Sequence, residues 1–317
     1  MSLAFVFPGQ GSQSVGMLAA LAAAEPVVQE TFAEASAVLG YDLWALCQQG
    51  PESELASTER TQPAMLAAGV ATWRAWLGHG GPRPVAMAGH SLGEYTALVC
   101  SGALEFATAV DLVRFRGQVM QQAVPLGQGA MAAVLGLDDA LVAEACREAE
   151  QGEVVEPVNF NSPGQVVIAG HATAVARAIA SAQARGAKRA VTLPVSVPSH
   201  SRLMMGAAER LAERLAGVEV RMPDVPAVYT VGVKTHSSPD GIRVALKEQL
   251  HKPVRWSDTV RAMLASGVTT IVECGPGKVL TSLNRRIERR PERAMLAVEN
   301  PEGLVAALAV CREKDHV

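Results

Sequence analysis

A Gly-x-Ser-x-Gly segment is the clearest candidate for chemistry in the chain. Gly89-His90-Ser91-Leu92-Gly93 follows the short apolar run Val85–Ala88 and precedes a helical pattern. A serine at such a strand-to-helix turn projects its hydroxyl, and the N–H groups that begin the next helix can stabilise a negatively charged oxygen. The context therefore favours a nucleophilic Ser91, and an ordinary glycine–serine turn is the alternative.

A serine nucleophile needs a base, and the chain contains seven histidines. His200 is our candidate because it ends the proline-stiffened segment 194–200, where a predicted strand passes into a helix. A surface histidine is the alternative interpretation. His90 is next to the serine, but neighbouring side chains on a tight turn point apart, so we expect it to pack or to form a local hydrogen bond.

The loop after the first predicted strand and one helix charge could complete such a site. Glycines on both sides of Gln10 let N–H groups turn toward an anion or carbonyl, although the loop matches neither a dinucleotide fingerprint nor a P-loop. Arg114 and Arg116 lie two apart on a predicted helix, so at most one faces a pocket. The planar guanidinium of an arginine can bind both oxygens of a carboxylate, so Arg116 could hold an acidic substrate. Composition alone favours the alternative, a solvated charge on the helix surface.

A basic segment lies near the end of the chain. Residues 278–293 contain six basic and two acidic residues, a net charge of +4. Such a segment is either a solvated helix face or a docking site for an acidic partner. The whole chain has a net charge of −3, which gives no drive toward nucleic acid or an anionic membrane.

The sequence gives no support to metal chemistry or to a membrane span. The five cysteines form no CxxC pair, and no HExxH or EF-hand pattern occurs, so we expect no metal. Scattered cysteines in an odd number indicate free thiols in a reducing cytoplasm. No run of 18 apolar residues is present, so we expect no segment that crosses a membrane.

The patterning predicts an α/β protein. The 317 residues are 49% apolar and 19% charged, a globular composition, and the length suits two domains or one with an insertion. Short apolar runs alternate with helical patterns through most of the chain. We expect strands at 3–7, 85–88 and 270–274, and helices at 61–77, 92–100, 105–123, 201–215, 241–250 and 257–266.

The stretch from 129 to 195 follows a different order. It predicts strands at 129–135, 154–160, 165–170 and 189–195, with helices at 138–149 and 172–185. The order β-α-β-β-α-β is typical of a ferredoxin-like unit. We therefore expect a small ferredoxin-like domain at 127–196, inserted into a larger α/β domain made of 1–126 and 197–317.

Six motifs extend this interpretation to nearly the whole chain. In order they read FVFPGQGSQ, GHSLGEY, RFRG, VNFNSPGQVVIAG, PVSVPSH and GPGKVL. Together they closely resemble the malonyl-CoA:acyl carrier protein transacylases, the discrete acyltransferases of bacterial type II fatty-acid synthesis. The resemblance implies an α/β-hydrolase-like large domain that carries a ferredoxin-like small domain. It also implies transfer of a malonyl group from malonyl-CoA to the phosphopantetheine thiol of acyl carrier protein, through a malonyl-serine intermediate.

The family's functional residues match individual positions of this chain. The resemblance implies a Ser91 nucleophile, a His200 base and oxyanion-hole amides at Gln10 and Leu92. It implies that Arg116 binds the malonyl carboxylate. It further implies that the backbone carbonyl of Gln249 orients the histidine, a role that an aspartate has in ordinary triads.

The resemblance also implies the partners. The substrates are malonyl-CoA and holo acyl carrier protein, and neither a cofactor nor a metal is required. Arg285 and Arg286 are the candidates for docking the acidic carrier protein. We expect a cytoplasmic monomer that binds neither nucleic acid nor a membrane.

Two segments depart from the family pattern. Residues 228–232, which include Thr230, stand where family members often have asparagines and an aspartate. Lys252 stands where asparagine is often found. Both segments lie near the positions that support the histidine.

Three other functions remain open. A serine hydrolase is disfavoured because 117 residues follow His200 and no acidic orienting residue is evident. A non-catalytic module that binds acyl carrier protein is disfavoured by the presence of both Ser91 and His200. A polyketide acyltransferase would differ from a fatty-acid enzyme only in its carrier protein.

Overall fold

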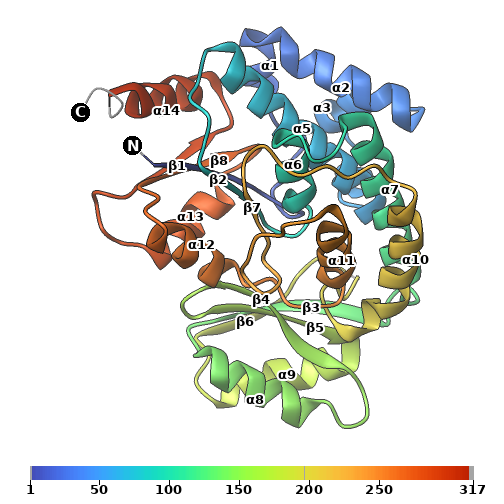
Figure 1. Cartoon of the computed structure of the whole chain (residues 1–317). Coiled ribbons are helices and arrows are strands. Elements are labelled where there is room, and N and C mark those ends of the chain that lie inside the picture. The colour runs from blue at the N-terminus through green and yellow to red at the C-terminus, as the bar shows by residue number, and fades with distance from the viewer. Residues whose placement is uncertain (1, 196, 314–317) are drawn as a thin grey trace.

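The computed structural model describes residues 2–195 and 197–313, and the chain forms two units built on two sheets (Figure 1). The larger sheet has five parallel strands in the order β7-β2-β1-β8-β9. Its strands are β1 (Leu3–Phe7), β2 (Ala86–Gly89), β7 (Ala227–Val228), β8 (Thr270–Cys274) and β9 (Ala294–Val298). Strands of this kind are apolar on both faces because helices cover both.

The alternation of side chains along β1 shows how the two faces are covered. The odd-numbered residues of β1 pack against helix α5 (Thr58–Gly78), where the Phe5 ring meets Trp73 and Trp76 edge to face at 5.1 Å. Its even-numbered residues belong to the core on the other face, with α12 (Trp256–Ala265) and α13 (Val279–Ile287). The large unit is therefore a three-layer α/β/α arrangement.

The remaining helices of the large unit come from both ends of the chain. They are α1 (Ala19–Ala24), α2 (Pro26–Leu39), α3 (Leu43–Gln49), α4 (Glu52–Leu55), α6 (Gly93–Cys100), α7 (Phe106–Gln122), the short 3-10 helix η1 (Arg202–Met204), α10 (Met205–Ala216), α11 (Pro239–Gln249) and α14 (Pro301–Glu313).

The smaller sheet is antiparallel, with the order β4-β5-β3-β6. Its elements are β3 (Gly129–Leu135), α8 (Asp139–Ala149), β4 (Val155–Ser162), β5 (Gln165–His171), α9 (Ala172–Ala184) and β6 (Arg189–Thr192). One face packs on α8 and α9. The other face, which includes Met131, Val158 and Val167, turns toward the large unit (Figure 1).

The predicted fold class is confirmed: the large unit has the parallel sheet and the small unit has the ferredoxin-like order. Strands 3–7, 129–135 and 270–274 have the predicted bounds. The predicted strand at 189–195 is too long, because β6 ends at Thr192 and the chain then turns, with the Val195 N–H donating to the Leu193 carbonyl. The predicted helix at 61–77 begins earlier, at Thr58.

The domain boundaries at 1–126, 127–196 and 197–317 stay a proposal. Residue 196, the last of the proposed small domain, lies outside the described residues, as do residues 1 and 314–317. None of the helices in the described ranges is long and apolar enough to cross a membrane.

Candidate active site

The Gly-x-Ser-x-Gly segment forms a sharp turn between β2 and α6. Ser91 has a φ of +52°, a left-handed conformation that costs energy in a residue other than glycine. A Cβ atom at Gly93 would lie 2.0 Å from the Phe7 carbonyl oxygen, so only glycine fits where α6 crosses the end of β1. The turn thereby raises Ser91 at the carboxyl edge of the parallel sheet, where α/β proteins bind ligands.

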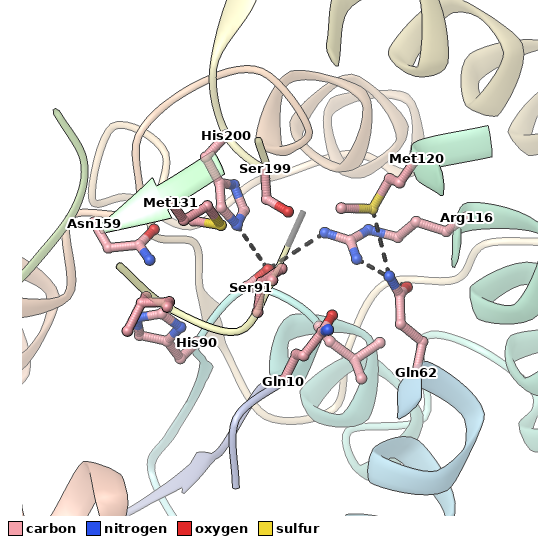
Figure 2. Close-up of a pocket in the computed structure, with 13 residues that line it drawn as sticks. Gln10, Gln62, His90, Ser91, Arg116, Met120, Met131, Asn159, Ser199 and His200 are labelled. Carbon is pink, nitrogen blue, oxygen red and sulfur yellow. Dashed lines mark hydrogen bonds between the residues drawn. The ribbon is translucent and has the colours of Figure 1, made fainter. Parts of the chain in front are cut away.

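The loop after β1 lies against this turn. A Cβ atom at Gly9 would come within 2.4 Å of the His90 carbonyl oxygen, so the close approach also requires glycine. The main-chain N–H groups of Gln10 and Leu92 have no hydrogen-bond partner within the described part of the chain. Both residues line the same pocket as Ser91, and Figure 2 shows Gln10 next to Ser91, so the two N–H groups are candidate oxyanion donors.

Ser91, His200 and Gln249 form a chain of hydrogen bonds. The Oγ atom of Ser91 lies 2.8 Å from Nε2 of His200. Nδ1 of His200 donates to the main-chain oxygen of Gln249 at 2.6 Å. Because a carbonyl only accepts, this contact places the ring proton on Nδ1 and leaves Nε2 free to take the serine proton. The geometry meets the requirement that a base be within hydrogen-bond reach of its nucleophile.

His200 is held rigidly and kept neutral. Its φ is +66°, and its N–H donates to the Leu250 carbonyl at 2.9 Å. The residue is only 3% exposed. Burial, followed by the nearby charge of Arg116, lowers the pKa of His200 to about 3, so the free imidazole is available as a proton acceptor at neutral pH.

Arg116 is buried beside the serine. The residue is 1% exposed, and Nη2 lies 3.4 Å from Ser91 Oγ (Figure 2). Nη1 donates to Gln62 Oε1 at 2.8 Å, and Nη2 donates to Gln249 Oε1 at 3.0 Å. Burial lowers the pKa of this guanidinium from its usual value. Composition alone favours a solvated charge at this position, and for Arg116 that interpretation is wrong.

Three polar residues that the sequence analysis left without a role complete the site. Gln62 holds Arg116 from α5, and Glu94 in the first turn of α6 accepts hydrogen bonds from Gln249 and Thr230. All three are buried. The motif GHSLGEY contains Glu94, so that residue left a signal in the sequence, whereas Gln62 follows other polar residues at the start of α5 and left none. Thr230 left none beyond its departure from the family pattern.

The pocket lies between the two units. One wall comes from the turn at Ser91, the loop after β1 and α7. The opposite wall comes from the face of the small sheet that turns toward the large unit. The lining residues are Gln10, Gln62, His90, Ser91, Leu92, Arg116, Met120, Met131, Asn159, Leu193, Val195, Ser199 and His200. An acyl chain that enters this pocket meets two methionines and the arginine together.

The other candidate residues take no part in the hydrogen-bond chain of Ser91, His200 and Gln249, although His90 also lines the pocket. Nε2 of His90 is 2.8 Å from Asn161 Oδ1, and its ring contacts Trp256, so it hydrogen-bonds across to β4 rather than within the turn. Arg114 pairs with Asp111 on the outer face of α7. The Lys252 side chain pairs with Glu248 at the surface, while its main chain hydrogen-bonds His200 and partly opposes the lowering of that pKa.

The basic segment forms α13 and the loop after it. Arg285 and Arg286 are exposed at the end of this helix, where Arg285 donates to the Met295 carbonyl and Arg286 to Gln165 Oε1. Neither forms an ion pair with a described residue, whereas Lys278 and Arg290 pair with Glu299 and Glu288. Within the described ranges, no group of three or more histidine, cysteine, aspartate or glutamate side chains could hold a metal ion.

Comparisons with known proteins agree with this geometry. The family model of the acyl transferase domain matches residues 4–302. The malonyl CoA-acyl carrier protein transacylase of Escherichia coli K12 is 59% identical over 305 residues, which cover 96% of this chain and 98% of that protein. The structure of an acyl carrier protein S-malonyltransferase from Vibrio cholerae has a TM-score of 0.94 at 55% identity, with 97% of this chain and 100% of that chain covered. A solved complex of a type II PKS acyl-carrier protein with its malonyl-transacylase contains a chain with a TM-score of 0.96 at 55% identity. The match covers 98% of this chain and 100% of that chain.

Proposed function

Because this chain belongs to the acyl transferase domain family, among its malonyl CoA-acyl carrier protein transacylases, we propose that it moves a malonyl group from coenzyme A to the phosphopantetheine thiol of an acyl carrier protein. One observation carries the proposal. A serine–histidine pair joined at 2.8 Å shares a pocket with a buried arginine whose Nη2 lies 3.4 Å from the serine oxygen. The first two groups suit acyl transfer and the third suits an acyl group that bears a carboxylate.

The first half-reaction is acylation of Ser91. Nε2 of His200 takes the hydroxyl proton as Oγ attacks the thioester carbonyl carbon of malonyl-CoA. The resulting oxyanion accepts hydrogen bonds from the main-chain N–H groups of Gln10 and Leu92. Such donors typically contribute about 3 kcal/mol each. The C–S bond then breaks, and CoA thiolate leaves with the proton from His200.

The second half-reaction reverses these steps. The thiol of the carrier protein gives its proton to His200 and attacks the malonyl-serine ester, and Ser91 leaves with that proton. The Gln249 carbonyl stabilises the protonated imidazole and holds the ring in one orientation. The reaction as written uses groups of this chain, one thioester substrate and one thiol substrate, so we propose no resident cofactor or metal.

Arg116 selects the acyl group. Its planar fork can bind both oxygens of the malonyl carboxylate, and a carboxylate that leaves water for this pocket needs such a partner. An acetyl group would leave the guanidinium unpaired. The contacts to Gln62 and Gln249 hold the fork in place before the substrate arrives.

We propose Arg285 and Arg286 as the docking site for the acidic carrier protein. Both are exposed and have no carboxylate partner among the described residues. Rim charges of this kind mainly steer the encounter between partners. We further propose a cytoplasmic monomer that acts in fatty-acid synthesis. A polyketide enzyme is the second candidate, because one similar chain was solved with a type II PKS carrier protein.

Intact-protein mass spectrometry tests the function. The wild type incubated with malonyl-CoA should gain one malonyl group, and Ser91→Ala should gain none. Ser199→Ala is the matched control, since Ser199 also lines the pocket and should leave the adduct intact. Holo carrier protein should then discharge the adduct to malonyl-carrier. An adduct on Ser91→Ala would refute the nucleophile, and faster release of free malonate than of malonyl-carrier would identify a hydrolase.

A further inference from the structure

A buried glutamate lies behind the proposed catalytic groups without contacting the pocket. Glu94 is 3% exposed, and its Oε1 accepts two hydrogen bonds from Thr230, from the N–H at 2.7 Å and from Oγ1 at 2.6 Å. Its Oε2 accepts a hydrogen bond from Gln249 Nε2 at 2.6 Å. Every one of these partners donates, which is the pattern that an ionised carboxylate requires.

The Gln249 amide connects this carboxylate to the site. The second hydrogen of Nε2 goes to the Ser91 carbonyl at 2.8 Å, and Oε1 accepts from Arg116. If the amide were turned over, its oxygen would face Glu94 and the Ser91 carbonyl, and its nitrogen would face the guanidinium. All three contacts would then be repulsive, so Glu94 decides which end of the amide meets Arg116.

The separation between Glu94 and Arg116 has its own consequence. A buried guanidinium needs a compensating negative charge, and removing that charge is costly. A glutamate bonded directly to Arg116 would compete with the carboxylate of the substrate. Here the amide of Gln249 lies between the two charges, and Arg116 Nε has no partner among the described residues. The positive charge is therefore balanced while donors remain for a ligand.

We propose that Glu94 is a positioning residue for malonyl recognition: it orients the Gln249 amide, which holds Arg116, and it balances the arginine charge without occupying the substrate's position. This inference rests on the proposed function. Burial raises the pKa of Glu94 to about 7, against the opposing effects of the donated hydrogen bonds and the charge of Arg116. The hydrogen bonds from Thr230 and Gln249 and the charge of Arg116 thus favour the ionised form of this carboxylate.

The test compares malonyl-CoA with acetyl-CoA as donors. In Glu94→Gln, an amide cannot accept from both Thr230 and Gln249, so one donor faces another donor and the charge balance is lost. The ratio of kcat/KM for malonyl over acetyl acylation of Ser91 should fall about tenfold or more, the scale of a lost hydrogen bond to a charged group. Acetyl acylation should stay within about threefold, because the contact between His200 and the Gln249 carbonyl remains.

Glu273→Gln is the matched control. Glu273 is also fully buried and accepts two hydrogen bonds, from the N–H groups of Leu280 and Thr281 at 3.0 and 2.7 Å. Burial raises its pKa to about 7 as well, but it lies away from the pocket. This variant should lose a similar amount of thermal stability and keep the malonyl-to-acetyl ratio. If both variants changed the ratio equally, Glu94 would have only a structural role.

Two more variants make the result decisive. If Glu94 acts through Arg116, Glu94→Gln should not change the ratio further in an Arg116→Ala background, and full additivity would overturn the proposal. If Glu94→Gln does not fold, Thr230→Val removes one donor to Glu94 and should still lower the ratio, whereas an unchanged ratio would refute the inference. A wild type without any malonyl adduct would instead refute the proposed function.

Discussion

Replacing Arg116 should change which acyl group the protein accepts. The guanidinium is 1% exposed, so a malonyl carboxylate that reaches it has lost most of its water. A hydrogen bond to a charged group contributes about 1.5–3 kcal/mol, which corresponds to about 10- to 150-fold in rate. Since a planar fork can make two such bonds, Arg116→Ala should lower malonyl kcat/KM by about two orders of magnitude. Acetyl acylation should hold or rise, because no unpaired guanidinium is left in the pocket.

The measurement is the ratio of kcat/KM for malonyl-CoA over acetyl-CoA, read as the rate of Ser91 acylation in the intact protein. Arg116→Lys should rescue poorly, because one ammonium cannot replace the fork that contacts both Gln62 and Gln249. Arg114→Ala is the matched control on the same helix. Its side chain pairs with Asp111 at the surface, so the ratio should not change.

An unchanged ratio in Arg116→Ala would refute the reasoning. It would mean that the carboxylate binds elsewhere and that Arg116 only fills the space between α5, α7 and α11. If the ratio were unchanged because malonyl and acetyl acylation fell by the same factor, Arg116 would have only a structural role. Only loss of malonyl acylation with retained acetyl acylation supports the assignment.

Three further predictions concern the base and the carrier protein. His200→Ala should fold and lose about 100- to 10,000-fold in transfer, the range typical of a general base, and a loss of less than about tenfold would contradict the assignment. Burial and the charge of Arg116 lower the pKa of His200 to about 3, so the base stays unprotonated as the pH falls. Labelling of Ser91 by a fluorophosphonate should therefore vary little between about pH 8 and about pH 5. A decline with a midpoint near the ordinary histidine pKa would show that the ring is not buried as described. Changing Arg285 and Arg286 together to glutamate should raise the KM for carrier protein and flatten its salt dependence, with acylation by malonyl-CoA unchanged. Equal damage to both half-reactions would mean that these arginines are structural or bind coenzyme A.

The parts of the fold that the sequence predicted well share one property. Strands β1, β3 and β8 are short apolar runs next to glycine or proline, and their bounds were predicted to the residue. Helices α1–α4, between residues 19 and 55, were not predicted. Three of them are short, but α2 has 14 residues and buries Val28, Phe32 and Leu39 at helical spacing, a pattern that indicates a helix and was overlooked. The two-residue strand β7 owes its existence to pairing with β2, which no local pattern records.

The candidate site divides in the same way. Ser91 is marked by local turn chemistry, and His200 by the prolines that precede it. Gln62, Glu94 and Thr230 act through contacts with distant parts of the chain: Thr230 and Glu94 are 136 residues apart. Arg116 shows the limit most clearly, since whether a helix arginine is solvated or buried depends on what packs against it. The sequence pattern gave its spacing from Arg114, and only the packing of α5 and α11 explains its burial.

A main-chain carbonyl stands where an ordinary triad has a carboxylate, and this choice suits the charge of the buried Arg116. An aspartate behind His200 would be a second anion close to the buried Arg116, and it would compete with the substrate for that charge. A carbonyl orients the imidazole through Nδ1 at 2.6 Å without adding a charge. Arg116 donates to the neutral oxygens of Gln62, Gln249 and Ser91. The nearby Tyr95 hydroxyl is neutral as well, because burial raises the pKa of Tyr95 to about 12. The malonyl carboxylate would then be the first anion to touch the guanidinium. In the proposed mechanism Gln249 would serve both requirements at once, because its main chain accepts from His200 and its side chain accepts from Arg116. The choice of acyl group and the transfer chemistry would then depend on one residue.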